Sequence, residues 1–131
     1  MERLLFLFLA VVISTSAVAG PEPQVPQVSD EIVQVSDVYI PTELKSNGDA
    51  YVVVNGMFPN SCYRFKQADV KNKSATEHEI RVIASVTKTM CLMVLVPFSK
   101  EVALGRLERG THRLRFVNGD GTYFEREMNV P

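Results

Sequence analysis

The sequence has few of the residues that carry enzyme chemistry, and it lacks the common catalytic motifs. Only two cysteines and two histidines occur among 131 residues. There is no GxSxG elbow, HExxH helix, phosphate-cradling glycine-rich loop or EF-hand spacing. We therefore expect a protein that is not an enzyme, and we expect no cofactor.

An excess of charge of one sign is also missing. The chain has 14 basic and 15 acidic residues, which give a formal net charge of −1. Proteins that bind nucleic acid normally present a basic field to the phosphates. We expect neither nucleic acid nor an anionic membrane surface as a partner.

No apolar run is long enough to span a bilayer, which takes about 20 residues. The run Leu4–Ile13 has ten residues. It follows Arg3 and precedes Ala17-Val18-Ala19, the small-x-small pattern that signal peptidase recognises. We predict a signal peptide over residues 1–19 and an exported mature chain, periplasmic or secreted, without an integral membrane anchor.

Residues 20–31 follow the predicted cleavage site. Three prolines among residues 20–27 predict a solvated tether, although simple terminal disorder explains the same composition equally well. The remainder, residues 32–131, has the size of one domain with a single core.

Short apolar runs separated by turn residues fill residues 32–131. The predicted strands are 32–40, 50–58, 62–70, 79–87, 90–98, 101–104, 111–117 and 122–130. Their spacing and the absence of a sustained helical period favour a β-sandwich or small barrel. The segment 90–98 is nearly all apolar, which predicts a strand buried on both faces. Asn118-Gly119-Asp120-Gly121 predicts a tight antiparallel hairpin between the last two strands.

The two cysteines, Cys62 and Cys91, are predicted to form one structural disulfide. An oxidising compartment makes a bridge the default for a cysteine pair. The pair is not a CxxC motif, and neither cysteine has a histidine within a few residues, which argues against a redox or metal role. The bridge is expected to hold the strand that starts at Cys62 close to the buried strand 90–98.

The histidines and methionines are candidate metal ligands. His78 is flanked by two carboxylates, which favours a solvated edge, while His112 begins an alternating strand and is expected to be partly buried. With Met90, Met93 and Cys91 they supply the imidazole, thioether and thiolate groups that suit copper. The spacings typical of blue-copper proteins and of His/Met copper chaperones are both absent, so we expect no metal site.

One pattern resembles a known group of proteins. It comprises Val54-Asn55-Gly56-Met57-Phe58-Pro59-Asn60-Ser61-Cys62-Tyr63, Cys91, Pro97-Phe98, Val102-x-Leu104-Gly105-x-Leu107, Gly110-Thr111 and Leu114-x-Phe116-Val117-Asn118-Gly119. The pattern covers roughly residues 50–120 and resembles small exported bacterial proteins of largely uncharacterised function. The resemblance implies an all-β, immunoglobulin-like antiparallel sandwich of seven to eight strands. It transfers no catalytic or binding residues. The residues themselves independently predict that Gly56 and Gly110 lie at turns.

These features predict a non-catalytic exported β-sandwich that binds or scaffolds an envelope or extracellular protein of a bacterium. The loops over residues 71–77 and 45–49 are the expected binding loops, with Lys66, Lys71 and Lys73 as candidate contacts. Two alternatives stay open. One is a periplasmic protein that binds copper or a small ligand. The other is an inhibitor of a secreted hydrolase, which would need a protruding rigid loop.

Overall fold

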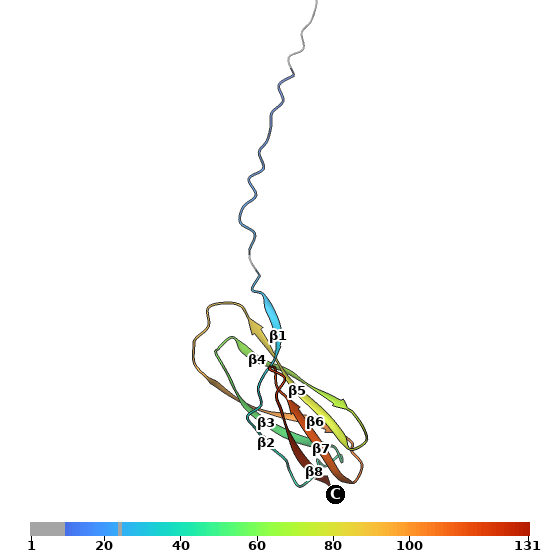
Figure 1. Ribbon diagram of the computed structural model, residues 1–131. Helices are drawn as coiled ribbons and strands as arrows, with labels where there is room; N and C mark the ends of the chain where they lie inside the picture. Colours follow the sequence, from blue (N-terminus) through green and yellow to red (C-terminus); the bar gives the residue numbers. More distant parts are fainter. Residues whose placement is uncertain (1–9, 24) are drawn as a thin grey trace, which may run out of the picture.

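Eight β-strands build the described part of the protein, which Figure 1 shows as a computed structural model. The structure describes residues 10–23 and 25–131, and this part of the chain contains no helix. The strands are β1 (Val28–Ile32), β2 (Asp37–Tyr39), β3 (Ala50–Phe58), β4 (Tyr63–Asn72), β5 (Glu77–Thr87), β6 (Val96–Gly105), β7 (Gly110–Val117) and β8 (Tyr123–Val130). The predicted all-β class and the number of strands are confirmed.

The strands form two sheets. The smaller sheet has the order β2-β3-β6, and the larger holds β1, β4, β5, β7 and β8. β5 is the centre of the larger sheet. Along one edge it pairs with β4 over most of its length. Along the other edge, β1 pairs with residues 83–87 and β7 pairs with residues 77–80.

One pairing departs from the predicted antiparallel sandwich. β5 and β7 run parallel, whereas every other described strand pair is antiparallel. A parallel pair needs a crossover, because both strands must start at the same end. Here the chain crosses to the smaller sheet as β6 and returns as β7. No local sequence signal marks that step.

The core lies between the sheets and follows the period of two that a half-buried strand requires. Along β5, Ile80, Val82, Ala84 and Val86 all point inward and are buried, as their alternation predicts. Val52 and Val54 of β3 are fully buried opposite them in the smaller sheet. Phe116, Leu114 and Met128 fill the core beneath β7 and β8.

The predicted final hairpin is confirmed. β7 and β8 pair antiparallel from Gly110 and Val130 to Val117 and Tyr123. The turn between them is closed by two backbone hydrogen bonds, Asn118 N–H to Thr122 O at 2.8 Å and Gly121 N–H to Asn118 O at 3.1 Å. Gly121 has a φ of 84°, in the left-handed region that favours glycine.

Gly56 does not lie at a turn, contrary to the prediction, but within β3. Its role is close approach. A Cβ on Gly56 would lie 2.5 Å from Cζ of Phe98 and 2.7 Å from the carbonyl oxygen of Gln34. The absent side chain makes room for a buried ring from the neighbouring strand.

Residues 10–23 and 25–27 form no helix or strand and are exposed. Residues 1–9 of the predicted signal peptide lie outside the described residues. β1 begins at Val28, within the segment predicted as a tether. In the described part of the chain, no helix with the length and apolar character of a membrane span is present.

Candidate functional site

The most unusual surface of the protein is the segment from Lys88 to Leu95, which we call the apolar loop. Its large side chains are exposed by 55 to 103%. They belong to Met90, Leu92, Met93, Val94 and Leu95. The prediction of a strand buried on both faces over 90–98 is therefore wrong, because β6 begins only at Val96.

The topology places this segment between the two sheets. Both sides of β5 are occupied, by β4 on one and by β1 and β7 on the other. After Thr87 the chain next pairs in the smaller sheet, where β6 lies beside β3. The apolar loop spans that crossing at the end of the sandwich, where the N-terminal segment also enters (Figure 1).

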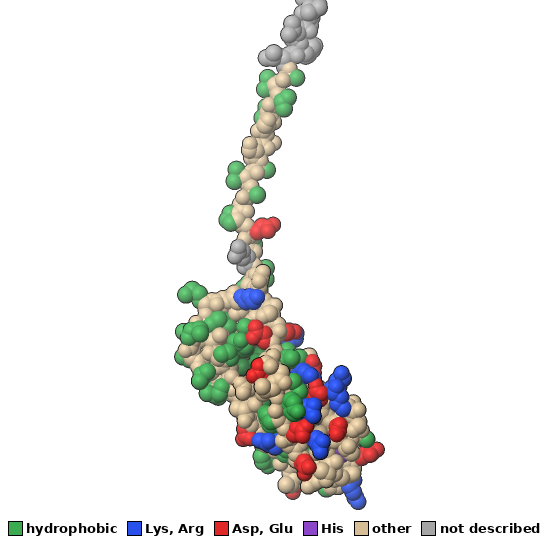
Figure 2. Space-filling model, viewed as in Figure 1, with side chains coloured by type: hydrophobic (Ala, Val, Ile, Leu, Met, Phe, Trp, Pro, Cys, Tyr) green, Lys and Arg blue, Asp and Glu red, His purple; other side chains and the backbone are tan. Residues whose placement is uncertain are grey.

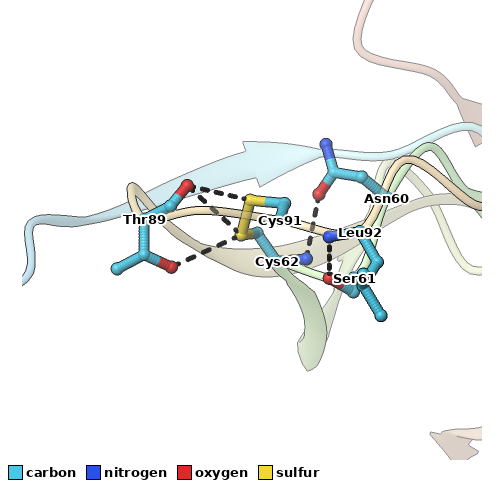
Figure 3. Close-up of a disulfide and its surroundings, with 6 residues drawn as sticks. All are labelled: Asn60, Ser61, Cys62, Thr89, Cys91 and Leu92. Carbon is cyan, nitrogen blue, oxygen red and sulfur yellow. Dashed lines mark hydrogen bonds between the residues drawn. A yellow bond between two sulfur atoms is a disulfide. The ribbon is translucent and has the colours of Figure 1, made fainter.

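A disulfide fixes the base of the apolar loop, as Figure 3 shows. The predicted bridge between Cys62 and Cys91 is confirmed, with the two Cα atoms 5.4 Å apart. We expected the bridge to hold two strands together, but Cys91 lies in the loop and not in a strand. Instead, it ties the loop to the turn between β3 and β4.

Two hydrogen bonds strengthen this attachment, and both join Ser61, next to Cys62, to Leu92, next to Cys91. The Ser61 N–H donates to the carbonyl oxygen of Leu92 at 3.1 Å. The Leu92 N–H donates to the Ser61 hydroxyl oxygen at 2.7 Å. Cys62 is held in turn, since its N–H donates to the Asn60 side-chain oxygen at 2.9 Å. The loop is thus anchored through its backbone while its side chains stay outside.

Figure 2 shows hydrophobic side chains gathered at this end of the domain. Soluble proteins rarely expose contiguous apolar surface without a use for it, and such patches mark interaction sites. Two of the loop's side chains are methionines, whose flexible thioether chains adapt to irregular apolar surfaces. The loop carries no titratable side chain after Lys88. The arrangement can therefore bind apolar surface.

The three lysines predicted as binding residues are not gathered into one site. Lys66 Nζ lies 2.6 Å from the Asp30 carboxylate on β1. Lys73 Nζ lies 3.5 Å from the Glu79 carboxylate on β5. Lys71 is exposed on β4, directly opposite Glu79 in the strand register. Each lysine therefore has an acidic neighbour, and none lies in the apolar loop.

The outer face of the larger sheet carries a network of charges around a pocket of about 250 Å³. Glu79 is nearly buried and pairs with Arg81 and Lys73. Burial raises the pKa of the Glu79 carboxyl, but these two cations outweigh burial and lower the pKa overall. Arg115 Nη2 lies 2.8 Å from the Glu125 carboxylate. Because these charges satisfy one another, the pocket offers no unmet charge to a ligand.

Both histidines are buried, and the prediction of a solvated edge for His78 is wrong. His78 is 3% exposed and His112 is 1% exposed. His78 Nε2 lies 2.9 Å from His112 Nδ1. The outer ring nitrogens reach the Asn72 side-chain oxygen and the Glu108 carbonyl oxygen, each at 2.6 Å. Burial, with a smaller contribution from His112, lowers the pKa of His78.

Sequence reasoning missed this pair for a simple reason. The carboxylates beside His78 are on the opposite face of β5, since neighbouring residues of a strand alternate. His78 is two residues before the buried Ile80, so both side chains point to the inward face of β5. This spacing was the signal in the sequence that His78 is buried. The parallel register of β5 and β7 then brings His112 into contact.

Of the five candidate copper ligands, only the two histidines lie in contact. Both cysteine sulfurs are engaged in the disulfide, and all four ring nitrogens of the histidines have hydrogen-bond partners within the protein. Met90 and Met93 lie on the apolar loop. Within residues 10–23 and 25–131, no group of three or more histidine, cysteine or acidic side chains is placed to hold a metal ion.

Fold and site together define a two-sheet, all-β sandwich with one disulfide. The family model of the ORF11 beta-sandwich domain matches residues 52–130, so the chain belongs to that family. The matched region runs from β3 to β8 and includes both cysteines and the apolar loop. No curated protein and no solved structure matches the chain.

Proposed function

We propose that this protein is a non-catalytic, exported binding module of the bacterial envelope, and that it binds a partner protein through the apolar loop. The observation that carries the proposal is the loop itself. Five large apolar side chains are held in solvent by a disulfide and by two hydrogen bonds between Ser61 and Leu92. The immunoglobulin-like character of the sandwich is part of the proposal, and the two facing sheets support it.

Export is supported by two independent features. The N-terminal sequence has the apolar run and small-x-small pattern of a signal peptide. The disulfide requires an oxidising compartment to form and persist. The periplasm and the extracellular space both satisfy that requirement.

The energetics favour a protein partner with a concave apolar surface. Burying one large aliphatic side chain contributes about 1.5–3 kcal/mol, so five side chains contribute about 8–15 kcal/mol. The loss of translational and rotational freedom on association costs about 4–15 kcal/mol. A loop that is already fixed adds little further ordering cost. The apolar loop thus provides a useful share of the affinity, and contacts beyond it would add the rest.

Site-specific photo-crosslinking in intact cells of the source organism tests this proposal. A photoreactive amino acid at Met93 is expected to give a discrete protein adduct, and the same amino acid at the exposed Arg109 is expected to give none. Replacing Leu92, Met93 and Leu95 by serine, with the probe moved to Val94, should abolish the adduct. We call this triple substitution the loop-serine variant.

The loop-serine variant should keep its free energy of unfolding within about 0.5 kcal/mol, because the replaced side chains are exposed. An adduct that persists in the folded loop-serine variant, or that forms equally from Arg109, would contradict binding through the loop.

A second candidate is an inhibitor of a secreted hydrolase, and the protruding, clamped loop is the observation that favours it. Disulfide-held loops can enter a concave cleft at low entropic cost. Titration of the purified protein against secreted proteases would then show saturable inhibition that the loop-serine variant loses. Intact activity of the whole protease panel at micromolar protein would remove this candidate.

A further inference from the structure

The two sheets of the sandwich differ in size, and the smaller one leaves part of the larger uncovered. On β5, the inward side chains of Ile80, Val82 and Ala84 are at most 1% exposed. The side chains beside them on β4 point the same way but are only partly buried. They are Tyr63, Phe65, Ala68 and Val70. The inner face of β4 therefore lacks the cover that the inner face of β5 has.

The free edge of β6 borders this uncovered face. Among the described residues, β6 pairs only with β3, and β4 pairs only with β5. An open groove of about 540 Å³ lies between the two unpaired edges, lined in part by Phe65 of β4 and Phe98 of β6. One more strand beside β6 would extend the smaller sheet over β4.

The groove carries two cations, Arg64 and Lys100. Neither forms an ion pair with any residue that the structure describes. Lys100 lies between Phe98 and Val102 in the alternation of β6, so it belongs to the inward-facing set. Its Nζ lies 5.6 Å from the centroid of the Phe65 ring. Inward-pointing charges on edge strands prevent identical edges from pairing. Two copies of β6 would bring two Lys100 ammonium groups together, which disfavours a second copy as the occupant.

We propose that the groove receives an extended acidic segment of a partner protein, which adds to β6 as a further strand of the smaller sheet. The proposal rests on the binding role argued above and deepens it by stating the partner's chemistry. Backbone hydrogen bonds to β6 hold the segment. Its apolar side chains cover Phe65 and Val70, and a carboxylate meets Lys100.

The position of the groove links it to the apolar loop. β6 continues directly from Leu95, and Arg64 follows Cys62 by two positions. One partner can therefore contact both surfaces. Pro97 has no backbone N–H to donate, so the added strand pairs with β6 from Phe98 onward.

A displayed library of random ten-residue peptides, selected against the full chain, tests this inference. Enriched peptides should alternate apolar residues and carry an aspartate or glutamate. A synthetic enriched peptide, followed by fluorescence anisotropy, should bind the Lys100→Glu variant about tenfold or more weakly. Replacing the peptide's acidic residue by lysine should restore binding to Lys100→Glu. Arg109→Glu is the matched control, because it makes the same charge change at an exposed residue away from the groove.

Amide hydrogen exchange adds a structural readout, since the bound peptide should slow exchange in residues 98–105. Lys100→Gln serves as a milder variant, with an intermediate loss of affinity expected. No enrichment, enriched peptides without acidic residues, or equal affinity of Lys100→Glu and Arg109→Glu would overturn the inference. The loop-serine variant should bind the peptide normally, so failure here is distinguishable from failure of the crosslinking experiment.

Discussion

Removing the disulfide should lower the stability of this protein by an amount that the chain geometry sets. Cys62 and Cys91 are 29 positions apart, so the bridge closes a loop of about 30 residues. Constraining a loop of that size in the unfolded chain is worth about 3.6 kcal/mol in the chain-entropy model. Replacing both cysteines by alanine should therefore reduce the free energy of unfolding by about 3.6 kcal/mol.

Urea unfolding measures this change directly. With an m-value of about 1.5 kcal/mol/M, the midpoint should fall by about 2.4 M. The m-value should also rise, because the unfolded chain without the bridge is less compact and exposes more surface. Both effects act through the unfolded state, so the near-ultraviolet spectrum of the folded double variant should stay close to that of the original protein.

Reductant provides the control. It should destabilise the original protein to the level of the double alanine variant and should leave that variant unchanged. A loss below about 1 kcal/mol, with an unchanged m-value, would refute the reasoning. It would mean that the pairing of β4 with β5 already restricts the unfolded chain as much as the bridge does.

Two further changes test the core and the buried histidines. Gly56→Ala should destabilise the protein by about 1–3 kcal/mol, because its Cβ would overlap the Phe98 ring. Gly20→Ala, where no atom lies within 4 Å, should change nothing, and equal effects of the two would refute the close-approach argument. His78 has a pKa lowered by burial, so the unfolded state binds the proton more readily and stability should fall as the pH drops through about 6.5. His78→Gln should remove that part of the pH dependence in urea titrations between pH 7.5 and 5.5. An unchanged pH dependence in His78→Gln would contradict the assignment.

Local patterns were enough to predict much of the fold. The alternation in β5 correctly placed its inward residues, and the NGDG turn correctly predicted the last hairpin. Both signals act within a few residues, where backbone preference and side-chain parity decide the outcome. The predicted disulfide between the two cysteines is also confirmed.

The candidate site depended on long-range pairing, which composition does not encode. An apolar run such as 90–95 has the composition of a buried strand, yet it lies in the crossing between the two sheets and is exposed. The contact between His78 and His112 likewise requires the parallel register of β5 and β7. The uncovered face of β4 follows from the unequal sizes of the sheets. No local sequence pattern predicts that the two sheets differ in size.

The placement of β1 has a consequence for how the protein folds. Val28 pairs with Thr87, and the neighbouring β7 reaches β5 only after β6 has crossed to the other sheet. Contacts between residues so distant in sequence make folding slow, since loop closure precedes the stabilising contacts. A chain that leaves an exporter N-terminus first would present β1 and the valine-rich β3 before β5 has emerged. During that interval the unpaired strands are open to aggregation, so we expect the yield of this small sandwich to depend more on chaperones than on the stability of the folded state.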